Sequence, residues 1–338
     1  MTAPGAGAPH ASSAVAVEAV VRTAGPAVAA LMERVEQRLS QLAVGHGPAL
    51  ARHARATIAA GGKRLRPLLV LLAAGEAGVD DDADRRLVRA AVAVELVHSA
   101  SLVHDDVLDG APLRRGAPTV VAEAGRIAAT ATGDLLFSRA FAELAAGGEP
   151  DDVRTLSSAA SALAEGELLQ RADAWNAGVD LDRYLHRCEL KTGSLFEAAC
   201  RLGALASGPS ARADALAAFG RRIGLAFQLL DDVLDIAGPP SRTGKARGTD
   251  LLDGTVTLPL ILARERDPAL ATLDLRALDG AADAEAVCER IAATGALATA
   301  KSRALAVVEE ARDRLPDLPQ RQRHLLELVA AGVVERYA

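Results

Sequence analysis

The sequence predicts an all-α fold, on three observations. Half of the 338 residues are hydrophobic (50%), and Ala and Leu, which are strong helix formers, dominate them. Only 2% of the residues are aromatic, whereas β-sandwiches depend on aromatic and β-branched strands. No convincing run alternates apolar and polar residues with the period of two that a strand requires.

Apolar residues recur at helical spacing from about Ala14 onward. Val28, Leu31, Val35 and Leu39 lie three or four positions apart, which places them on one face of a helix. The preceding residues 1–13 are small, polar and rich in Pro and Gly, so we expect a disordered tail. Breaks rich in Gly, Pro and Asp divide the rest, and they predict turns between helices rather than strand hairpins. These breaks fall at 61–62, 78–84, 110–116, 147–151, 177–180, 208–209, 238–248 and 279–283.

The segment 14–338 is expected to form one domain, because no break is long enough to be a linker. The longest break, 238–248, is interpreted as a mobile functional loop. The most apolar stretches, 67–75 and 325–334, are shorter than the ~20 residues that span a bilayer, so no transmembrane segment is expected. No Lys or Arg precedes position 22, which argues against a secretory signal. The three scattered cysteines predict neither a disulfide framework nor a zinc site, and a cytoplasmic location follows; they are Cys188, Cys200 and Cys288.

The charge balance bears on possible partners. The net charge is −6 and the isoelectric point is about 5.7. A generic polyanion-binding surface is therefore not expected, and the scarcity of aromatic residues argues against stacking on single-stranded nucleic acid. We expect no nucleic-acid partner. Any anionic ligand must be held by a local basic cluster or by metal ions.

The pentapeptide DDVLD occurs twice, and both copies follow an apolar helical run and precede a glycine-containing break. Positions i and i+4 of a helix share one face. The carboxylates crowd each other at a helix C-terminus, where the helix dipole also disfavours them. Carboxylate oxygens suit Mg²⁺, which commonly shares its ligands with substrate phosphates. The candidate metal ligands are Asp105, Asp106 and Asp109 in the first copy and Asp231, Asp232 and Asp235 in the second. A single acidic run of this kind is more often solvated surface, but its duplication on two apolar helices favours the metal hypothesis.

Basic and polar residues occur between and around these clusters. The segment 61–67 (GGKRLRP) combines two glycines with Lys63, Arg64 and Arg66, and arginine suits bidentate phosphate contacts. Each of the other candidates is weak alone, but together they supply enough cations for two diphosphates. They are Arg114, Arg115, Lys191, Thr192, Gln228 and Lys245.

These motifs, in this order, resemble the trans-isoprenyl (polyprenyl) diphosphate synthase family. The resemblance runs from about Gly61 to Leu260 and also includes HSASLVHDDVLD, Gly133-Asp134, KTGSLF and DLLDGTVTLPL. It implies one bundle of mostly antiparallel helices around a deep central cavity, the isoprenoid synthase fold, and a homodimer. It also implies a Mg²⁺-dependent prenyltransferase that joins an allylic diphosphate to isopentenyl diphosphate.

The resemblance also implies roles for individual residues. The six aspartates bind Mg²⁺; the allylic diphosphate is held by Arg114, Lys191 and Lys245; the isopentenyl diphosphate is held by Lys63, Arg66, His98 and Arg115. Lys191, Thr192 and Gln228 match the catalytic residues, the last two beside the reacting carbons. The family often has lysine where this chain has Thr255, so one diphosphate contact is missing, and nearby Arg247 is a candidate substitute. No strong general base is needed, and His104 suits orienting a carboxylate or capping a helix end better than proton transfer.

The helix that carries Asp105 also predicts product length. Ser101 lies one turn below Asp105, about 6 Å along the axis, with Ala100 beside it and Val97 below. In this family a bulky aromatic residue at the position of Ser101 or Ala100 ends chain elongation early and gives short products. The small residues here therefore predict a long-chain product. The segment 135–137 is a candidate for closing the pocket instead.

Three alternatives remain open. A short-chain farnesyl or geranylgeranyl diphosphate synthase would have the same motifs and a shallower pocket. A class I terpene cyclase would leave the segment 61–67, His98, Arg115 and the second acidic cluster unexplained. A non-catalytic subunit of a heteromeric synthase would usually lack some of the six aspartates.

Overall fold

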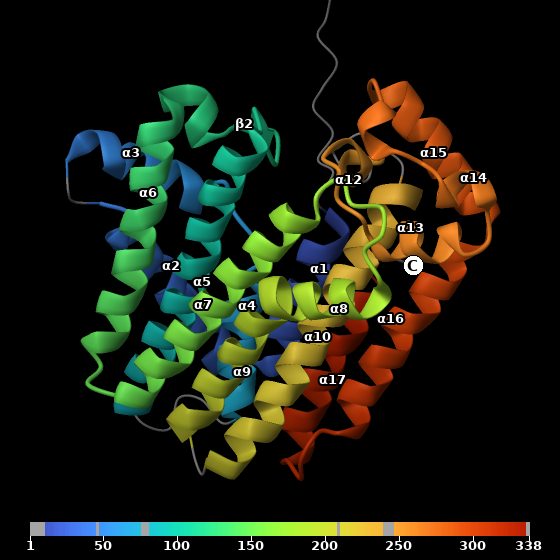
Figure 1. Ribbon diagram of the computed structural model, residues 1–338. Helices are drawn as coiled ribbons and strands as arrows, with labels where there is room; N and C mark the ends of the chain where they lie inside the picture. The colour runs from blue at the N-terminus through green and yellow to red at the C-terminus, as the bar shows by residue number, and fades with distance from the viewer. Residues whose placement is uncertain (1–10, 45–46, 76–80, 208–209, 239–246, 336–338) are drawn as a thin grey trace, which may run out of the picture.

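The computed structural model describes residues 11–44, 47–75, 81–207, 210–238 and 247–335. The chain forms a bundle of helices, as predicted (Figure 1). The N-terminal half comprises α1 (Ala11–Ala24), α2 (Pro26–Leu42), α3 (Pro48–Ala59), α4 (Leu65–Ala74), α5 (Asp81–Asp109), α6 (Val120–Ala145) and α7 (Pro150–Asp173). The central elements are α8 (Leu181–Cys188), a π-helical turn (Glu189–Gly193), α9 (Ser194–Ser207) and α10 (Ser210–Ala237). The C-terminal part contains α12 (Thr249–Leu252), α13 (Leu258–Arg264), α14 (Pro268–Ala271), a 3₁₀ turn (Leu275–Ala277), α15 (Ala281–Ala293), α16 (Ala296–Asp313) and α17 (Gln320–Glu335).

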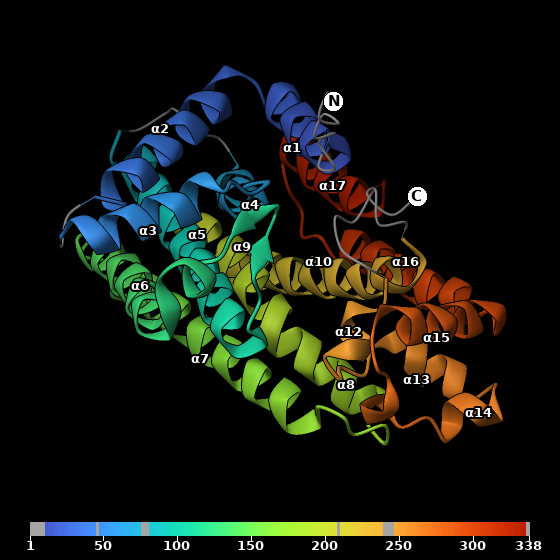
Figure 2. The same cartoon turned by 90° about the horizontal axis from the view of Figure 1, so that it is seen from above.

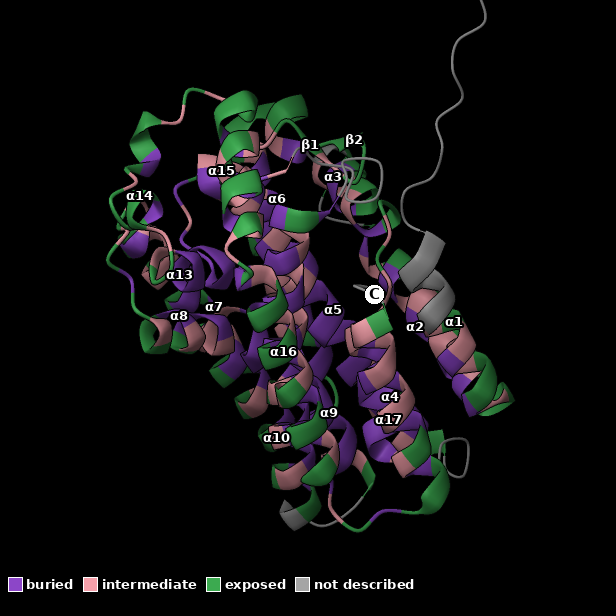
Figure 3. Cartoon of the chain, turned by 90° about the vertical axis from the view of Figure 1, so that its right-hand side faces the viewer, coloured by how far each residue is buried: buried purple, intermediate pink, exposed green. Residues whose placement is uncertain are grey.

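The core surrounds α5. Helices α4, α6 and α9 pack against it, and α10 packs in turn against α9 and α16. Figures 1 and 2 agree that α3 and α6 lie on one side of the bundle and α13 to α15 on the other, and Figure 2 shows α1 beside α17. Figure 3 shows the buried residues gathered on the inward faces, while α14 and α15 expose much of their surface. The predicted face of α2 is confirmed, because Val28, Leu31, Val35 and Leu39 are all buried.

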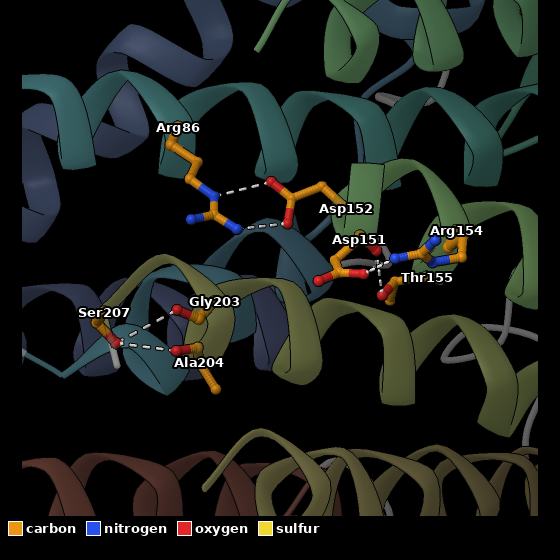
Figure 4. Close-up of polar contacts among 8 residues, drawn as sticks. All are labelled: Arg86, Asp151, Asp152, Arg154, Thr155, Gly203, Ala204 and Ser207. Atoms are coloured by element: carbon orange, nitrogen blue, oxygen red, sulfur yellow. Dashed lines mark hydrogen bonds and ion pairs between the residues drawn. The ribbon is translucent and has the colours of Figure 1, made fainter. Parts of the chain in front are cut away.

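Helices α5 and α7 run in the same direction, and this sets the geometry of the site. Near their starts, the Arg86 guanidinium donates to both carboxylate oxygens of Asp152 at 2.8 and 2.9 Å (Figure 4). Near their ends, Arg171 of α7 pairs with Asp109 of α5. Residues equally far from these end contacts therefore lie at the same level of the bundle.

By length and composition, α5 is apolar enough to cross a membrane, and it contains a longer apolar window than the stretches singled out in the sequence. However, 72% of that window is buried inside the protein. Its apolar character is explained by its place in the core.

Two boundaries differ from the sequence prediction. Helix α1 begins at Ala11, so the expected boundary after residue 13 falls inside a helix; residues 1–10 lie outside the described residues. The break at 110–116 was predicted to contain no hairpin, and that was wrong. Strands β1 (Leu113–Arg114) and β2 (Ala117–Pro118) pair there as an antiparallel ribbon. Its two turn residues, Arg115 and Gly116, both have left-handed backbones (φ 53° and 79°), the geometry of a tight type I′ turn.

Candidate active site

A cavity of about 290 Å³ opens at the C-terminal ends of α5 and α10. Its walls come from α4, α5, α7, α8 with the π-helical turn, α9, α10 and the segment 249–257. The apolar part of the lining includes Leu102, Leu163, Leu195 and Phe227, and the polar part includes carboxylates from both DDVLD segments. Both acidic clusters therefore meet over one partly apolar hollow, as the sequence predicts.

The first cluster divides its carboxylates between the cavity and a neighbouring arginine. Asp105 and Asp109 line the cavity, because residues four apart share a helical face. Asp106 is buried (5% exposed) and does not line it. Instead, Nε of Arg114 donates to Asp106 Oδ1 at 2.7 Å. Asp106 therefore fixes Arg114 one residue before the hairpin turn; Arg114 does not line the cavity, but its charge acts on Asp105, which does.

The second cluster divides its carboxylates in a similar way. Asp231 and Asp232 line the cavity, whereas Asp235 does not, and its Oδ2 accepts the backbone N–H of Asp250 at 3.3 Å. Asp232 is buried (2% exposed) and accepts hydrogen bonds from the Tyr184 hydroxyl at 2.5 Å and from Gln228 Nε2 at 2.7 Å. Asp232 is thus held in place by Tyr184 and Gln228, and Asp231 also faces the cavity.

Two of these carboxyl groups, Asp105 and Asp232, have raised pKa values. Burial raises the pKa of Asp105 to about 6, although the charge of Lys191 opposes the shift. Burial and the charge of Asp250 raise the pKa of Asp232 to about 7, although its hydrogen bonds from Tyr184 and Gln228 oppose the shift. Such shifts mark negative charge that the protein does not fully neutralise. A divalent cation bound here would relieve them.

The residues present fit Mg²⁺ shared with a substrate rather than a preformed metal site. Among the described residues, no group of three His, Cys, Asp or Glu side chains converges as a ligand set. Mg²⁺ usually takes one or two carboxylates, water and substrate phosphates. Asp105, Asp109 and Asp231 offer such carboxylates around one cavity.

Two charged residues of α7 belong to the site and were missed in the sequence. Glu167 pairs with Lys191 and also accepts from Arg171 Nε at 2.9 Å. Burial alone would raise the pKa of Glu167, but the charges and hydrogen bonds of Lys191 and Arg171 lower it. Arg171 in turn pairs with Asp109. The four-residue spacing of Glu167 and Arg171 was the available signal, but it is common on exposed helices.

The π-helical turn places two predicted catalytic residues on the cavity wall. Lys191 and Thr192 lie in this turn, and π-turns within helices are frequent at functional sites. Gly166 of α7 packs directly against it, since a Cβ there would come within 2.5 Å of the Lys191 backbone nitrogen. The Thr192 hydroxyl donates to Gln228 Oε1 at 2.8 Å. A hydrogen-bonded chain therefore links Thr192 through Gln228 to Asp232.

The predicted basic site is only partly assembled in the cavity. Arg66 and His98 line it, and the Arg66 guanidinium stacks over the Phe196 ring at 4.5 Å. Burial lowers the pKa of His98 well below its usual value, and the charges of Arg66 and Arg115 lower it further. Arg115 lies outside the lining, in the hairpin turn, yet close enough to act on both. Lys63 instead borders a small apolar pocket beside α1 and α17.

Arg64, which the motif also contains, has a structural role. Its guanidinium pairs with Glu36 at 2.5 Å and Glu95 at 2.7 Å. These pairs fix the start of α4, where Arg64 has a left-handed backbone (φ 50°).

Arg247, the candidate substitute for the missing lysine, forms ion pairs outside the cavity. Arg247 pairs with Glu285 and Glu289 of α15 and donates to the backbone oxygen of Ile236 at 2.8 Å. It does not line the cavity, whereas Thr255 does. The suggestion that Arg247 replaces that lysine is therefore not supported. Lys245 lies outside the described residues, as does most of the predicted loop 238–248.

His104 faces α6 rather than the cavity. Its Nε2 lies 3.3 Å from Asp134 Oδ1, and its ring stacks on Phe137 at 5.7 Å. Gly133 makes room for this ring, because a Cβ there would lie 2.2 Å from Nε2. The Gly133-Asp134 motif thus orients His104. Phe137 packs against the core and does not line the cavity, so the segment 135–137 does not close it.

Of the three predicted chain-length residues, only Ser101 lines the cavity. Ala100 and Val97 are fully buried (0% exposed) and do not line it, although Val97 lies one turn below Ser101 on the same face of α5. Ser101 lies eight residues before Asp109, and Leu163 lies eight residues before Arg171 on the parallel helix α7. Eight residues correspond to about 12 Å. Ser101 and Leu163 therefore lie at one level, about 12 Å below the Asp109–Arg171 contact.

Comparisons with known proteins agree with this geometry. The family model for polyprenyl synthetase matches residues 48–293. The chain is 42% identical to heptaprenyl diphosphate synthase component 2 of Geobacillus stearothermophilus, over 70% of this chain and 72% of that protein. It is 37% identical to the geranylgeranyl diphosphate synthase of Methanosarcina mazei, over 85% of this chain and 90% of that protein. The crystal structure of a Caulobacter crescentus polyprenyl synthase, complexed with calcium and isoprenyl diphosphate, superposes with a TM-score of 0.88 at 35% identity, covering 95% and 98% of the two chains.

Proposed function

This chain belongs to the polyprenyl synthetase family and is a prenyl diphosphate synthase, and on that premise we propose that it elongates an allylic diphosphate with isopentenyl diphosphate to a long-chain, all-trans polyprenyl diphosphate. One observation carries the proposal. Carboxylates from the ends of α5 and α10 face the same cavity, whose deeper wall is apolar. One cavity can therefore hold both the charged diphosphate and the apolar prenyl chain of the substrate.

The allylic diphosphate is assigned to the acidic rim. Asp105, Asp109 and Asp231 would hold Mg²⁺ there, and Lys191 would contact the phosphate oxygens once it exchanges its partner Glu167 for the substrate. When bound, Mg²⁺ neutralises the diphosphate and so eases cleavage of the allylic C–O bond. Arg114, held by Asp106, adds a fixed positive charge that acts on Asp105.

The isopentenyl diphosphate is assigned to the basic wall formed by Arg66, His98 and Arg115. The Arg66 Nε is buried without a hydrogen-bond partner among the described residues, as expected of a group that receives a ligand. His98 remains neutral at physiological pH because burial and the nearby arginines lower its pKa. It can therefore accept or donate one hydrogen bond without adding charge. Lys63, which borders another pocket, would have to change conformation to take part.

The carbon chemistry is assigned to the wall between these sites. Loss of diphosphate leaves an allylic cation, the isopentenyl double bond attacks it, and a proton passes to the departing diphosphate. Thr192 donates its hydroxyl hydrogen to Gln228, so its oxygen lone pairs remain available to the developing cation. Gln228 is oriented by Asp232 in turn. Positioning and charge stabilisation, rather than a strong base, carry the reaction.

The long-chain product rests on the small side chain at Ser101 and on the similarity to a heptaprenyl synthase component. A geranylgeranyl product is the alternative that the similarity to the Methanosarcina enzyme favours. We further propose a homodimer in the cytoplasm, which light scattering of the purified protein and fractionation would test.

The test supplies farnesyl and isopentenyl diphosphates with Mg²⁺ or with chelator, and sizes the extracted products. We expect stepwise addition of isopentenyl units beyond geranylgeranyl length, and only with Mg²⁺. Release of diphosphate without isopentenyl incorporation would instead indicate a cyclase. In parallel, inorganic diphosphate should raise the thermal unfolding temperature only when Mg²⁺ is present. Asp105→Asn and Asp231→Asn should lose that shift, whereas Asp182→Asn on the exposed side of α8 should keep it.

A further inference from the structure

We propose that Arg187 and Thr257 form an additional binding subsite for the allylic diphosphate, which supplies the cation that is missing at Thr255. Both residues line the cavity on the wall made by α8 and the segment 249–257. The inference deepens the function proposed above and rests on it. The sequence assigns neither residue a role.

Arg187 is buried but incompletely bonded. Its side chain is only 3% exposed, so it is not a surface charge. Nη2 donates to the backbone oxygen of Val256 at 2.7 Å, which fixes the guanidinium plane. Nη1 is buried and has no hydrogen-bond partner among the described residues; the nearest carboxylate oxygen, Asp173 Oδ2, is 3.8 Å away. A buried charged group with an unmade hydrogen bond requires an explanation, and a ligand in the adjoining cavity is one.

The neighbouring carboxylate accounts for the arginine only in part: Asp173 Oδ2 forms an ion pair with Arg187 Nη1, but their separation of 3.8 Å is too long for a hydrogen bond. Asp173 already pairs with Arg183, whose Nε lies 2.6 Å from Oδ1. The two arginines therefore leave one positive charge in excess over Asp173. The same cavity wall also contains the carboxylates of Asp250 and Asp253, so the subsite would take a diphosphate together with bound metal rather than a bare anion.

Thr257 supplies a second, independent observation. It is 2% exposed, and its Oγ1 is a buried atom with no hydrogen-bond partner among the described residues. Although Thr257 precedes α13, its hydroxyl makes no capping hydrogen bond. Val256, whose carbonyl holds Arg187, is its immediate neighbour. Two unsatisfied donors thus lie along one cavity wall, as a phosphate group requires.

The position favours the allylic diphosphate over the isopentenyl one. Arg187 lies four residues before Lys191, and both line the cavity together with Asp231 and Asp232. The basic wall of Arg66 and His98 comes from other helices, α4 and α5. Thr255, where the family often has lysine, lies next to Val256. Arg187 therefore reaches from α8 toward the place that lysine would occupy.

The primary experiment measures binding of inorganic diphosphate with Mg²⁺ by calorimetry, and KM for each substrate, in the wild type and Arg187→Met. We expect the variant to bind diphosphate about 10- to 100-fold more weakly, the range for a lost hydrogen bond between charged groups. The KM for the allylic substrate should rise with it, while the KM for isopentenyl diphosphate stays within about twofold. Unchanged diphosphate affinity, or an equal rise in both KM values, overturns the proposal.

Arg183→Met is the matched control, because it removes the other partner of Asp173 from the same helix but lies outside the cavity lining. It should leave diphosphate affinity unchanged; an effect equal to that of Arg187→Met would show that only neutralisation of Asp173 matters. Adding Thr255→Lys to Arg187→Met should restore part of the lost affinity, although Thr255→Lys alone changes the wild type little. If Thr255→Lys raises the diphosphate affinity of the wild type more than that of Arg187→Met, the two side chains do not share one subsite.

Arg187→Met removes a buried contact to Val256, so folding is checked by thermal unfolding. If it does not fold, Arg187→Lys and the isosteric Thr257→Val take its place, and wild-type diphosphate affinity in both overturns the subsite. Failure of the subsite remains distinct from failure of the proposed function. A wild type that incorporates no isopentenyl diphosphate refutes the function, whereas the calorimetric comparison refutes the subsite alone.

Discussion

Replacing Ser101 by phenylalanine should shorten the polyprenyl product. Ser101 lines the cavity at the level of Leu163, about 12 Å below the contact between Asp109 and Arg171. The growing tail must pass this level as it extends away from the diphosphate. A phenylalanine ring at this position would fill the space between α5 and α7.

The depth of the cavity gives the magnitude. An extended isoprene unit contributes four backbone bonds of about 1.5 Å, or roughly 5 Å of length along the chain. About two units therefore span the 12 Å between the Asp109 level and Ser101. With the ring in place, we expect elongation to stop at geranyl or farnesyl length, two or three units, whereas the wild type continues. Overpacking of this wall should also cost about 1–3 kcal/mol of unfolding free energy.

The assay extracts products from dimethylallyl and isopentenyl diphosphates and sizes them by chromatography after removal of the diphosphate. Ser302→Phe, on the exposed face of α16, is the control for the same substitution outside the cavity, and its products should match the wild type. Urea unfolding confirms that Ser101→Phe is folded. A folded Ser101→Phe enzyme with the wild-type product distribution would refute the assignment of Ser101 to the path of the tail.

Three further predictions concern the supporting residues. Tyr184→Phe should lower the unfolding free energy by about 1.5–3 kcal/mol at pH 8, where Asp232 is ionised, because it removes a hydrogen bond to a buried carboxylate; urea unfolding at pH 5, where Asp232 is protonated, should show a smaller loss, and equal losses at both pH values would contradict this. The native pKa of His98 lies well below its unfolded value near 6.5, so its contribution to stability is present above that pH and is lost as pH falls. Below pH 6, the free energy of unfolding of the wild type should therefore fall by up to about 1.4 kcal/mol per pH unit more than that of His98→Gln. Parallel curves of unfolding free energy against pH for the two proteins would refute the pKa shift. Gly166→Ala should displace the Lys191 backbone and reduce turnover at least about tenfold, because its Cβ would come within 2.5 Å of a backbone nitrogen; near-normal turnover in the folded variant would show that the π-helical turn tolerates movement.

Several residues show where sequence reasoning reached the site and where it stopped. Both DDVLD segments were correctly placed at helix ends, because an apolar helical run followed by glycine is a local pattern. The pattern did not distinguish Asp106, which holds Arg114, from Asp105, which faces the cavity. It also did not distinguish Asp232, which Tyr184 holds from 48 residues away. The three aspartates of a cluster are equivalent in sequence and become different only through their neighbours.

Other parts of the site left no usable signal. Glu167 and Arg171 resemble any charged pair on an exposed helix, and only the parallel course of α5 and α7 brings them to Asp109 and Lys191. Arg187 reads as one charge among several in its segment, yet packing buries it beside the cavity.

The sequence by itself determined what is local: the helical composition, the apolar faces, and the i, i+4 spacing that turns two carboxylates of a cluster toward one side. Tertiary structure alone decided which charges meet, which aspartates are clamped, and how far the apolar wall extends below the rim. The physical reason is range. Backbone hydrogen bonds and helical periodicity act over about four residues, whereas burial and ion pairing join side chains from helices far apart in the chain, and the same side chain has a different chemistry once its partners are fixed.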